Sequence, residues 1–135
     1  MSIEKQIERF FTSPVFGVVG ASTNRDKYGN KVLRCYQQNN LQVIPVHPKE
    51  KQIEAVHCVA SVADLPKEVQ SISIITPPKI TEKIVEQAAA HGIKNIWMQV
   101  GSESPAAVQY CEEQGLNVIA DGSCVLVVLG YHEHE

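Results

Sequence analysis

The chain has 135 residues, of which 44% are hydrophobic, and its formal net charge at pH 7 is −3. This length is typical of one domain with its own core, and the slight acidity offers no broad positive surface for nucleic acid or an anionic membrane. No apolar run approaches the ~20 residues of a membrane span, and early acidic residues replace the apolar segment of a signal peptide. Four irregularly spaced cysteines exclude a Cys-x-x-Cys motif, so we expect reduced thiols, no metal and a cytoplasmic protein.

Predicted strands and helices alternate along the chain. The helical spacing of Ile3, Ile7, Phe10 and Phe11 predicts a helix over residues 1–12. Apolar runs and amphipathic stretches then predict, in order, a strand at 15–20, a helix at 29–39, a strand at 41–46, an edge strand at 55–58, a helical turn at 61–66, a strand at 71–75, a helix at 80–91, a strand at 94–100, a helix at 104–114 and a strand at 117–120. Residues 121–129 fit either a short helix or a terminal strand, and we expect a mobile tail at 131–135.

This alternation predicts one α/β domain over residues 1–135, a Rossmann-like three-layer fold with a mostly parallel sheet and helices on both faces. Pro45 inside a strand removes one ladder donor, so we expect it at a strand end or at a non-bonded position. Trp97 is expected in the core. Ligands of such folds bind beyond the carboxyl ends of the strands, so the residues that follow each strand are the candidates for function.

The first strand runs into a glycine turn and then a long polar, basic loop. Small residues permit a phosphate to approach the backbone, hydroxyl and amide groups donate hydrogen bonds, and cations balance the charge. The loop is too long for a Gly-x-Gly-x-x-Gly turn, which disfavours classical NAD binding. The candidate ligand contacts here are Gly20, Ala21, Ser22, Thr23, Asn24, Arg25, Lys27 and Lys31.

The ends of three further strands supply the other candidates. His47 and Lys49 follow the second strand, where an NAD site has an acidic residue, so a phosphorylated ribose is expected there: that of CoA or of NADP. The rigid sequence Thr76-Pro77-Pro78 ends another strand and suits an adenine face or a pantetheine arm. Gly101 follows the next strand, so we expect it at the same edge of the sheet.

Taken together, these strand ends are similar to those of the small stand-alone CoA-binding domain proteins, and to the N-terminal CoA-binding domain of the succinyl-CoA synthetase alpha subunit. The likeness covers about residues 16–124 and rests on Gly17-Val-Val-Gly-Ala-Ser22, Val43-Ile-Pro-Val-His-Pro-Lys49, Asp64-Leu-Pro66, Ile75-Thr-Pro-Pro78 and Ile96-Trp-Met-Gln-Val-Gly-Ser-Glu103. It implies that residues 20–24 with Lys31, His47, Lys49, Thr76, Pro77 and Pro78 line a CoA groove. Residues 50–56 depart from the family pattern because they lack its glycines.

The long phosphate loop, the basic end of the second strand and the Thr-Pro-Pro wall lead us to expect non-catalytic binding of CoA or an acyl-CoA by a carrier, sensor or regulatory module. A homodimer or a separate enzyme is the expected further partner. No catalytic constellation is visible, and the second domain of the synthetase, with its phosphorylatable histidine, is missing from this sequence. His47 suits binding as well as base catalysis, and Cys124 leads an apolar run typical of a buried thiol. Two alternatives remain: an NADP(H)-dependent oxidoreductase or redox sensor, and a structural partner domain without ligand.

Overall fold

Five parallel strands form the sheet that the sequence predicts, and a computed structural model describes residues 1–133 of the chain. In their order across the sheet the strands are β2 (Gln42–Val46), β1 (Val15–Val19), β5 (Val69–Ile74), β6 (Asn95–Met98) and β7 (Asn117–Ile119). Every neighbouring pair among them runs parallel, so the expected α/β fold is confirmed.

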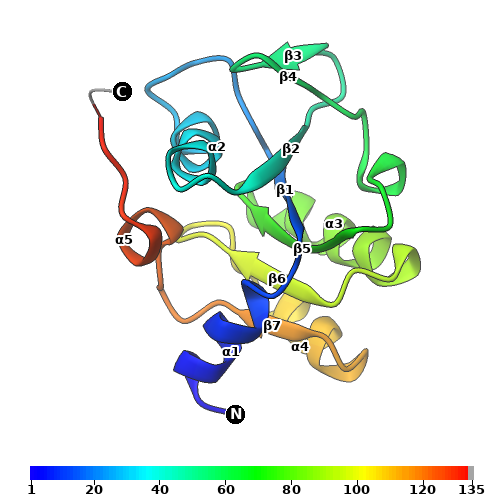
Figure 1. Cartoon of the computed structure of the whole chain (residues 1–135). Coiled ribbons are helices and arrows are strands. Elements are labelled where there is room, and N and C mark those ends of the chain that lie inside the picture. Colours follow the sequence, from blue (N-terminus) through cyan, green and yellow to red (C-terminus); the bar gives the residue numbers. More distant parts are fainter. Residues whose placement is uncertain (134–135) are drawn as a thin grey trace.

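Helices cover both faces of this sheet (Figure 1). On one face lie α1 (Ile3–Phe10), α2 (Tyr28–Gln38) and α5 (Val125–Leu129); on the other lie the 3₁₀ turn η1 (Val62–Asp64), α3 (Pro78–His91) and α4 (Pro105–Glu113). Serine caps begin two of the helices: Ser2 accepts the Lys5 amide at α1, and Ser104 accepts the Ala107 amide at α4. Residues 121–129, ambiguous from sequence, therefore contain a short helix.

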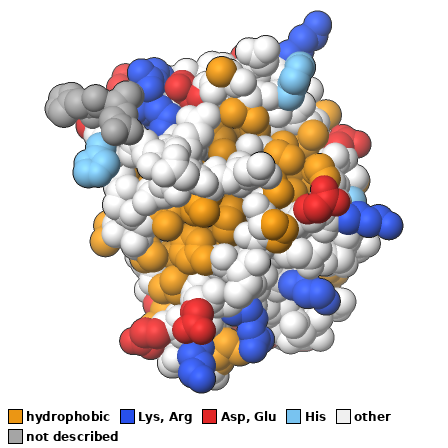
Figure 2. Space-filling model, in the orientation of Figure 1, with side chains coloured by type: hydrophobic (Ala, Val, Ile, Leu, Met, Phe, Trp, Pro, Cys, Tyr) orange, Lys and Arg blue, Asp and Glu red, His pale blue; other side chains and the backbone are white. Residues whose placement is uncertain are grey.

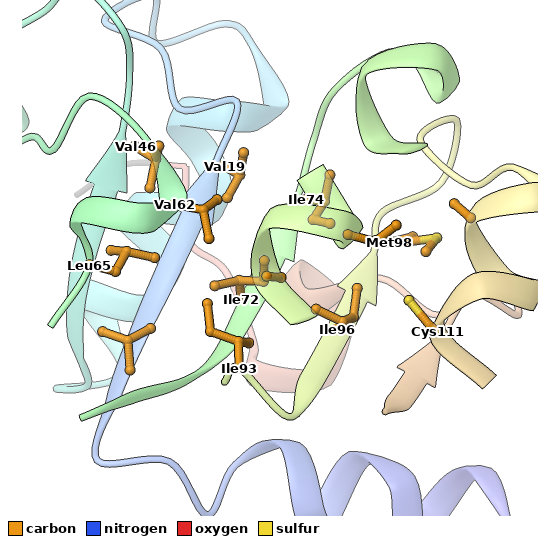
Figure 3. Packing of buried hydrophobic residues seen from close by; sticks show 14 residues of the cluster. Val19, Val46, Val62, Leu65, Ile72, Ile74, Ile93, Ile96, Met98 and Cys111 are labelled. Atoms are coloured by element: carbon orange, nitrogen blue, oxygen red, sulfur yellow. The ribbon is translucent and has the colours of Figure 1, made fainter. Parts of the chain in front are cut away.

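Two hydrophobic clusters, one on each face, hold the three layers together. Figure 3 shows the cluster beneath η1, α3 and α4, where Val19 and Val46 of adjacent strands approach Val62 and Leu65. The opposite cluster is aromatic and includes Trp97, which is fully buried, as expected, with its ring 5.1 Å from that of Phe10. Burial of both sheet faces explains the continuous apolar runs of the strands.

The two edges of the sheet are protected in different ways. Gln6 of α1 donates to the Val118 carbonyl, and Asn117 donates to the Gln6 carbonyl, so α1 covers the β7 edge. At the β2 edge the Pro45 carbonyl accepts from the Val59 amide, outside the ladder with β1. Pro45 thus faces away from β1 and removes no donor from that ladder, which satisfies the expected non-bonded position.

The segment between β2 and η1 differs from the expectation of a single edge strand. It forms an antiparallel hairpin of β3 (Gln52–Ile53) and β4 (Val56–His57), separate from the main sheet. Its two turn residues, Glu54 and Ala55, have φ values of 50° and 66°, in the left-handed region that glycine or asparagine usually occupies. Residues 50–56, which lack glycine, thus form a tight turn with Glu54 and Ala55 in the left-handed region.

Residues 131–132, which follow α5, contact α2. Gln38 exchanges two hydrogen bonds with the backbone of His132, and Tyr131 lies 5.4 Å from the Arg34 guanidinium. Residues 134–135 of the expected tail lie outside the described residues. Figure 2 shows hydrophobic side chains gathered over and beside α5, where Val127 is 80% exposed.

Candidate ligand site at the carboxyl edge of the sheet

The chain reverses its direction of travel across the sheet between β1 and β5. From β1 it passes through α2 to β2 on one side, whereas from β5 it passes through α3 to β6 on the other. The loops that leave β1 and β5 therefore diverge to opposite faces and open a crevice at their carboxyl ends, the usual ligand position in such sheets.

Two glycines permit a close approach of backbone segments at this crevice. Gly20 follows β1 with a φ of 92°, and a Cβ added there would lie 2.2 Å from the Ile75 carbonyl oxygen. A Cβ on Gly29 would lie 2.1 Å from the Gly20 carbonyl oxygen. The first turn of α2 thus packs directly on the end of β1, as the close helix–strand packing of a phosphate-binding turn requires. The sequence predicted only that a helix begins near Gly29.

The start of α2 carries backbone donors that the fold leaves unused. Lys27 occupies the N-cap without a side-chain cap, and the Tyr28 and Gly29 amides have no acceptor among residues 1–133. Such amides, together with the helix dipole, favour an anion. They border a cavity of about 470 Å³ whose lining is Gly20, Ala21, Ser22, Asp26, Lys27, Tyr28, Gly29, His47 and Ile75. The Asp26 carboxylate opposes an anion, and the Lys27 ammonium balances it.

A second, more apolar cavity of about 380 Å³ adjoins the first, with Gly20, Ala21 and His47 common to both. Its other lining residues are Val19, Val46, Pro48, Ala60, Ser61, Val62, Thr76, Ile80, Ile84 and Gln87. Helical periodicity alone predicts core positions for Ile80 and Ile84, but Ile80 is 43% exposed and both line this cavity. Their spacing with Gln87 along α3, directly after a strand end, is the sequence signal that could have identified this wall.

Most of the predicted phosphate loop is supported by its own side chains. The Ser22 hydroxyl accepts the Asn24 amide, and the Asn24 side-chain oxygen accepts the Asp26 amide, each at 3.0 Å. Gly20, Ala21, Ser22 and Lys27 line the cavities, whereas Thr23 and Asn24 are exposed on the outer part of the loop. Asn24 therefore shapes the loop.

Two cations of the predicted phosphate loop and the helix after it lie outside these cavities. Arg25 Nε is 3.4 Å from Glu54 Oε2 at the hairpin turn, and Lys31 Nζ is 3.8 Å from Glu133 Oε2 in the C-terminal segment. Arg25 instead lines a separate cavity of about 230 Å³ beside Arg34. Both side chains thus have acidic partners within the fold, and their contact with a ligand stays a prediction.

His47 has a defined orientation at the end of β2. Its Nδ1 accepts the amides of Lys49 at 3.0 Å and of Glu50 at 2.9 Å. The neutral ring therefore carries its proton on Nε2, which leaves an N–H donor on a residue that both cavities share. Lys49 is exposed and lines neither cavity, although it follows β2 immediately beside them.

The remaining predicted residues are spread along the edge. Thr76 lines the apolar cavity, and its hydroxyl lies 2.7 Å from that of Thr81. Pro77 and Pro78 form the N-cap and the first residue of α3, are exposed, and line neither cavity. Gly101 lies in the β6–α4 turn, where its amide donates to Glu103; it does not border the cavities.

The cysteines are free thiols. Burial raises the pKa of Cys35 to about 11 and that of Cys111 to about 12. Cys124 is half-buried at the start of α5, where Gln99 lies 3.3 Å from its sulfur. Among residues 1–133 no group of three or more metal-ligating side chains is found, and no helix there combines the length and apolarity needed to cross a bilayer.

A doubly wound parallel sheet with helix amides and an apolar pocket at its switch point defines the class of domains that bind nucleotide-like cofactors. More particularly, the chain belongs to the CoA-binding domain family, whose model matches residues 15–130. This match confirms the resemblance noted in the sequence.

Individual relatives agree with this family. The chain is 31% identical over 88 residues to the ADP-forming acetate–CoA ligase I of Archaeoglobus fulgidus, a match of 65% of this chain but only 13% of that protein. Among solved structures, a conserved hypothetical protein from Pyrococcus furiosus has a TM-score of 0.81 and 35% identity, over 84% of this chain and 97% of the other. A hypothetical protein from Pyrococcus horikoshii has a TM-score of 0.86 and 28% identity, over 94% and 89%.

Proposed function

We propose that this chain binds CoA or an acyl-CoA at the carboxyl edge of its sheet and acts as a carrier, sensor or regulatory module. The observation that carries the proposal is the pair of adjoining cavities, one bordered by the free amides of α2 and the other apolar. Membership of the CoA-binding domain family supports the choice of ligand.

Each part of CoA has a matching part of the site. The diphosphate suits the α2 amides of Tyr28 and Gly29, because backbone donors and the helix dipole both favour anions. The adenine suits the apolar cavity between Val46 and Ile80. The ribose then lies beside the end of β2, where the Nε2 donor of His47 and the exposed ammonium of Lys49 would meet its 3′-phosphate.

A non-catalytic role is supported by the chemistry of the lining. His47 cannot act as a base through Nδ1, which already accepts two backbone amides, and its Nε2 carries the proton in the neutral ring. The rest of the apolar cavity consists of aliphatic side chains, backbone, hydroxyls and one amide. The match to the ligase from Archaeoglobus covers only 13% of that protein, so the likeness supports the proposed ligand and not the ligase activity.

Calorimetric titration with CoA, acetyl-CoA, 3′-dephospho-CoA and NADPH tests the proposal. We expect CoA to bind and 3′-dephospho-CoA to bind about fivefold more weakly, since an exposed charge pair contributes up to about 1 kcal/mol. Lys49→Met should reduce this difference, whereas Lys94→Met, an exposed lysine before β6, should not. Equal affinity for the two ligands contradicts the role of Lys49. No binding or thermal shift with any CoA species contradicts the function, and tighter binding of NADPH would favour the redox alternative.

A further inference from the structure

Asn30 lies in the first turn of α2, fully buried, and its side chain joins three separate segments. Its Nδ2 donates to the Ser22 carbonyl in the phosphate loop at 2.9 Å and to Glu54 Oε2 in the hairpin turn at 3.0 Å. Its Oδ1 accepts from Arg34 Nε at 2.6 Å. Every hydrogen-bonding group of the Asn30 amide thus has a partner, which is how a buried polar network becomes rigid.

The same network reaches the far end of the phosphate loop. Arg34 is only 4% exposed, and its second guanidinium nitrogen donates to the Arg25 carbonyl at 2.9 Å. The Arg25 side chain in turn lies 3.4 Å from Glu54. Two carbonyls of the loop, at Ser22 and Arg25, are therefore anchored to the side chains of α2.

Anchoring these carbonyls has a consequence for the ligand. A carbonyl oxygen that faced the site would repel a phosphate, but the Ser22 oxygen is held against Asn30. Because the C=O and N–H of a trans peptide point in opposite directions, this bond turns the Thr23 amide to the other side of the loop. The Ser22 carbonyl is thereby held by Asn30 and is not free to turn toward a phosphate, before any ligand binds.

The hairpin turn supplies the charged member of the network. Glu54 and Ala55 keep a left-handed backbone without glycine, and the Glu54 carbonyl is held by Gln37 of α2 at 3.1 Å. In this conformation of the turn, Glu54 Oε2 lies 3.0 Å from Asn30 Nδ2 and 3.4 Å from Arg25 Nε. Left-handed backbone at a non-glycine residue persists where surrounding contacts hold it, and these contacts are of that kind.

We propose that Glu54, Asn30 and Arg34 are positioning residues that preorganise the phosphate loop, so that a remote hairpin sets the affinity for the diphosphate group of CoA. This inference rests on the proposed function for its ligand, but not for its effect on the loop. Preorganisation raises affinity because the free loop has less conformational freedom to lose on binding.

The sharpest variant is Glu54→Gly, because glycine accepts the positive φ of the turn while the carboxylate is removed with the rest of the side chain. We expect amide hydrogen exchange in residues 20–27 to accelerate in the ligand-free variant while β1 and β5 stay at the wild-type level. Glu54→Gln, which retains an acceptor for Asn30, should restore protection, and Glu86→Ala, an exposed glutamate of α3, should have no effect.

Ligand titrations complete the test. Glu54→Gly should weaken CoA about tenfold, an effect typical of lost preorganisation, but leave adenosine 3′-phosphate, which lacks the diphosphate, within about twofold. Wild-type exchange in residues 20–27 of Glu54→Gly overturns the inference, and so does equal weakening of both ligands. If the wild-type protein binds no CoA, the proposed function fails, while the exchange measurement still decides whether the network holds the loop.

Discussion

At the scale of single residues, Gly29 decides whether α2 can meet the sheet. Any side chain there would collide with the Gly20 carbonyl, since even a Cβ atom would lie 2.1 Å from that oxygen. We expect Gly29→Ala to cost about 3 kcal/mol of unfolding free energy, at the upper end of the cost of overpacking. Gly115→Ala is the matched control: Gly115 has a φ of 73° and open space around it, so only about 1 kcal/mol of backbone strain is expected.

Urea unfolding of both glycine variants provides the measurement. A Gly29→Ala protein as stable as Gly115→Ala would show that the backbone around Gly20 yields to the new methyl group. In that case the close packing would be a feature of the helix position and not a requirement of the site.

The Cys111 thiol makes the stability depend on alkaline pH. Burial raises its pKa from 9.0 to about 12, so between these values the unfolded chain releases a proton that the folded protein retains. The contribution is fully present below pH 9 and is lost as pH rises toward 12, by at most about 1.4 kcal/mol per pH unit. We expect urea unfolding from pH 8 to 10.5 to show a steeper decline for the wild type than for Cys111→Ala. Identical slopes would contradict this assignment.

At the scale of elements, α3 contributes a wall to the site that its periodicity does not reveal. Ile80 is 43% exposed at the cavity, so its replacement removes little buried area from the folded protein. We expect Ile80→Ser to weaken CoA about fivefold through lost apolar contact, with a change in stability below about 0.5 kcal/mol. Val127 of α5 is 80% exposed and lies outside the cavities, so Val127→Ser should change neither the CoA affinity nor the stability.

Isothermal titration and urea unfolding of Ile80→Ser and Val127→Ser separate the effect on binding from the effect on stability. Unchanged CoA affinity in Ile80→Ser would show that the adenine does not contact α3. A large loss of stability would show that Ile80 is a core residue, as its helical spacing predicts.

The sequence reveals the elements whose signal is local and misses those set by contact. Val15–Val19 is a buried apolar run, and Ser104-Pro105 is a cap with proline at the first helical position, so both elements were predicted. The β3–β4 hairpin was not, because Gln52 and Ile53 show no periodicity and Glu54-Ala55 is not a typical tight turn.

The candidate site also has a part that the sequence predicts and a part that it does not. The strand ends that line it, such as Gly20 and His47, follow from the rule that ligands bind beyond parallel strands. That rule does not predict the position of a flexible side chain. Arg25 contacts Glu54 and Lys31 contacts Glu133, and the sequence could not indicate these pairs because the partners are distant along the chain.

At the scale of the whole molecule, the site connects the two helical layers. The loop after β1 leads to α2 on one face, and Ile80 belongs to α3 on the other, so a bound CoA would contact both layers. We therefore expect one cooperative transition that CoA shifts as a unit, as is usual for a small single domain. A ligand at 100 times its dissociation constant adds about 2.7 kcal/mol to the unfolding free energy.

Two probes test this coupling in one urea titration. Trp97 is buried in the aromatic cluster under α1 and α2, with its indole N–H bonded to the Ser123 carbonyl, so its fluorescence reports on that face alone. Far-UV circular dichroism reports on the helices of both faces. With and without CoA the two curves should coincide and move together. A Trp97 transition that stays in place while the dichroism shifts would contradict the single cooperative transition, because a ligand that binds only the native state of a two-state domain shifts every probe by the same amount.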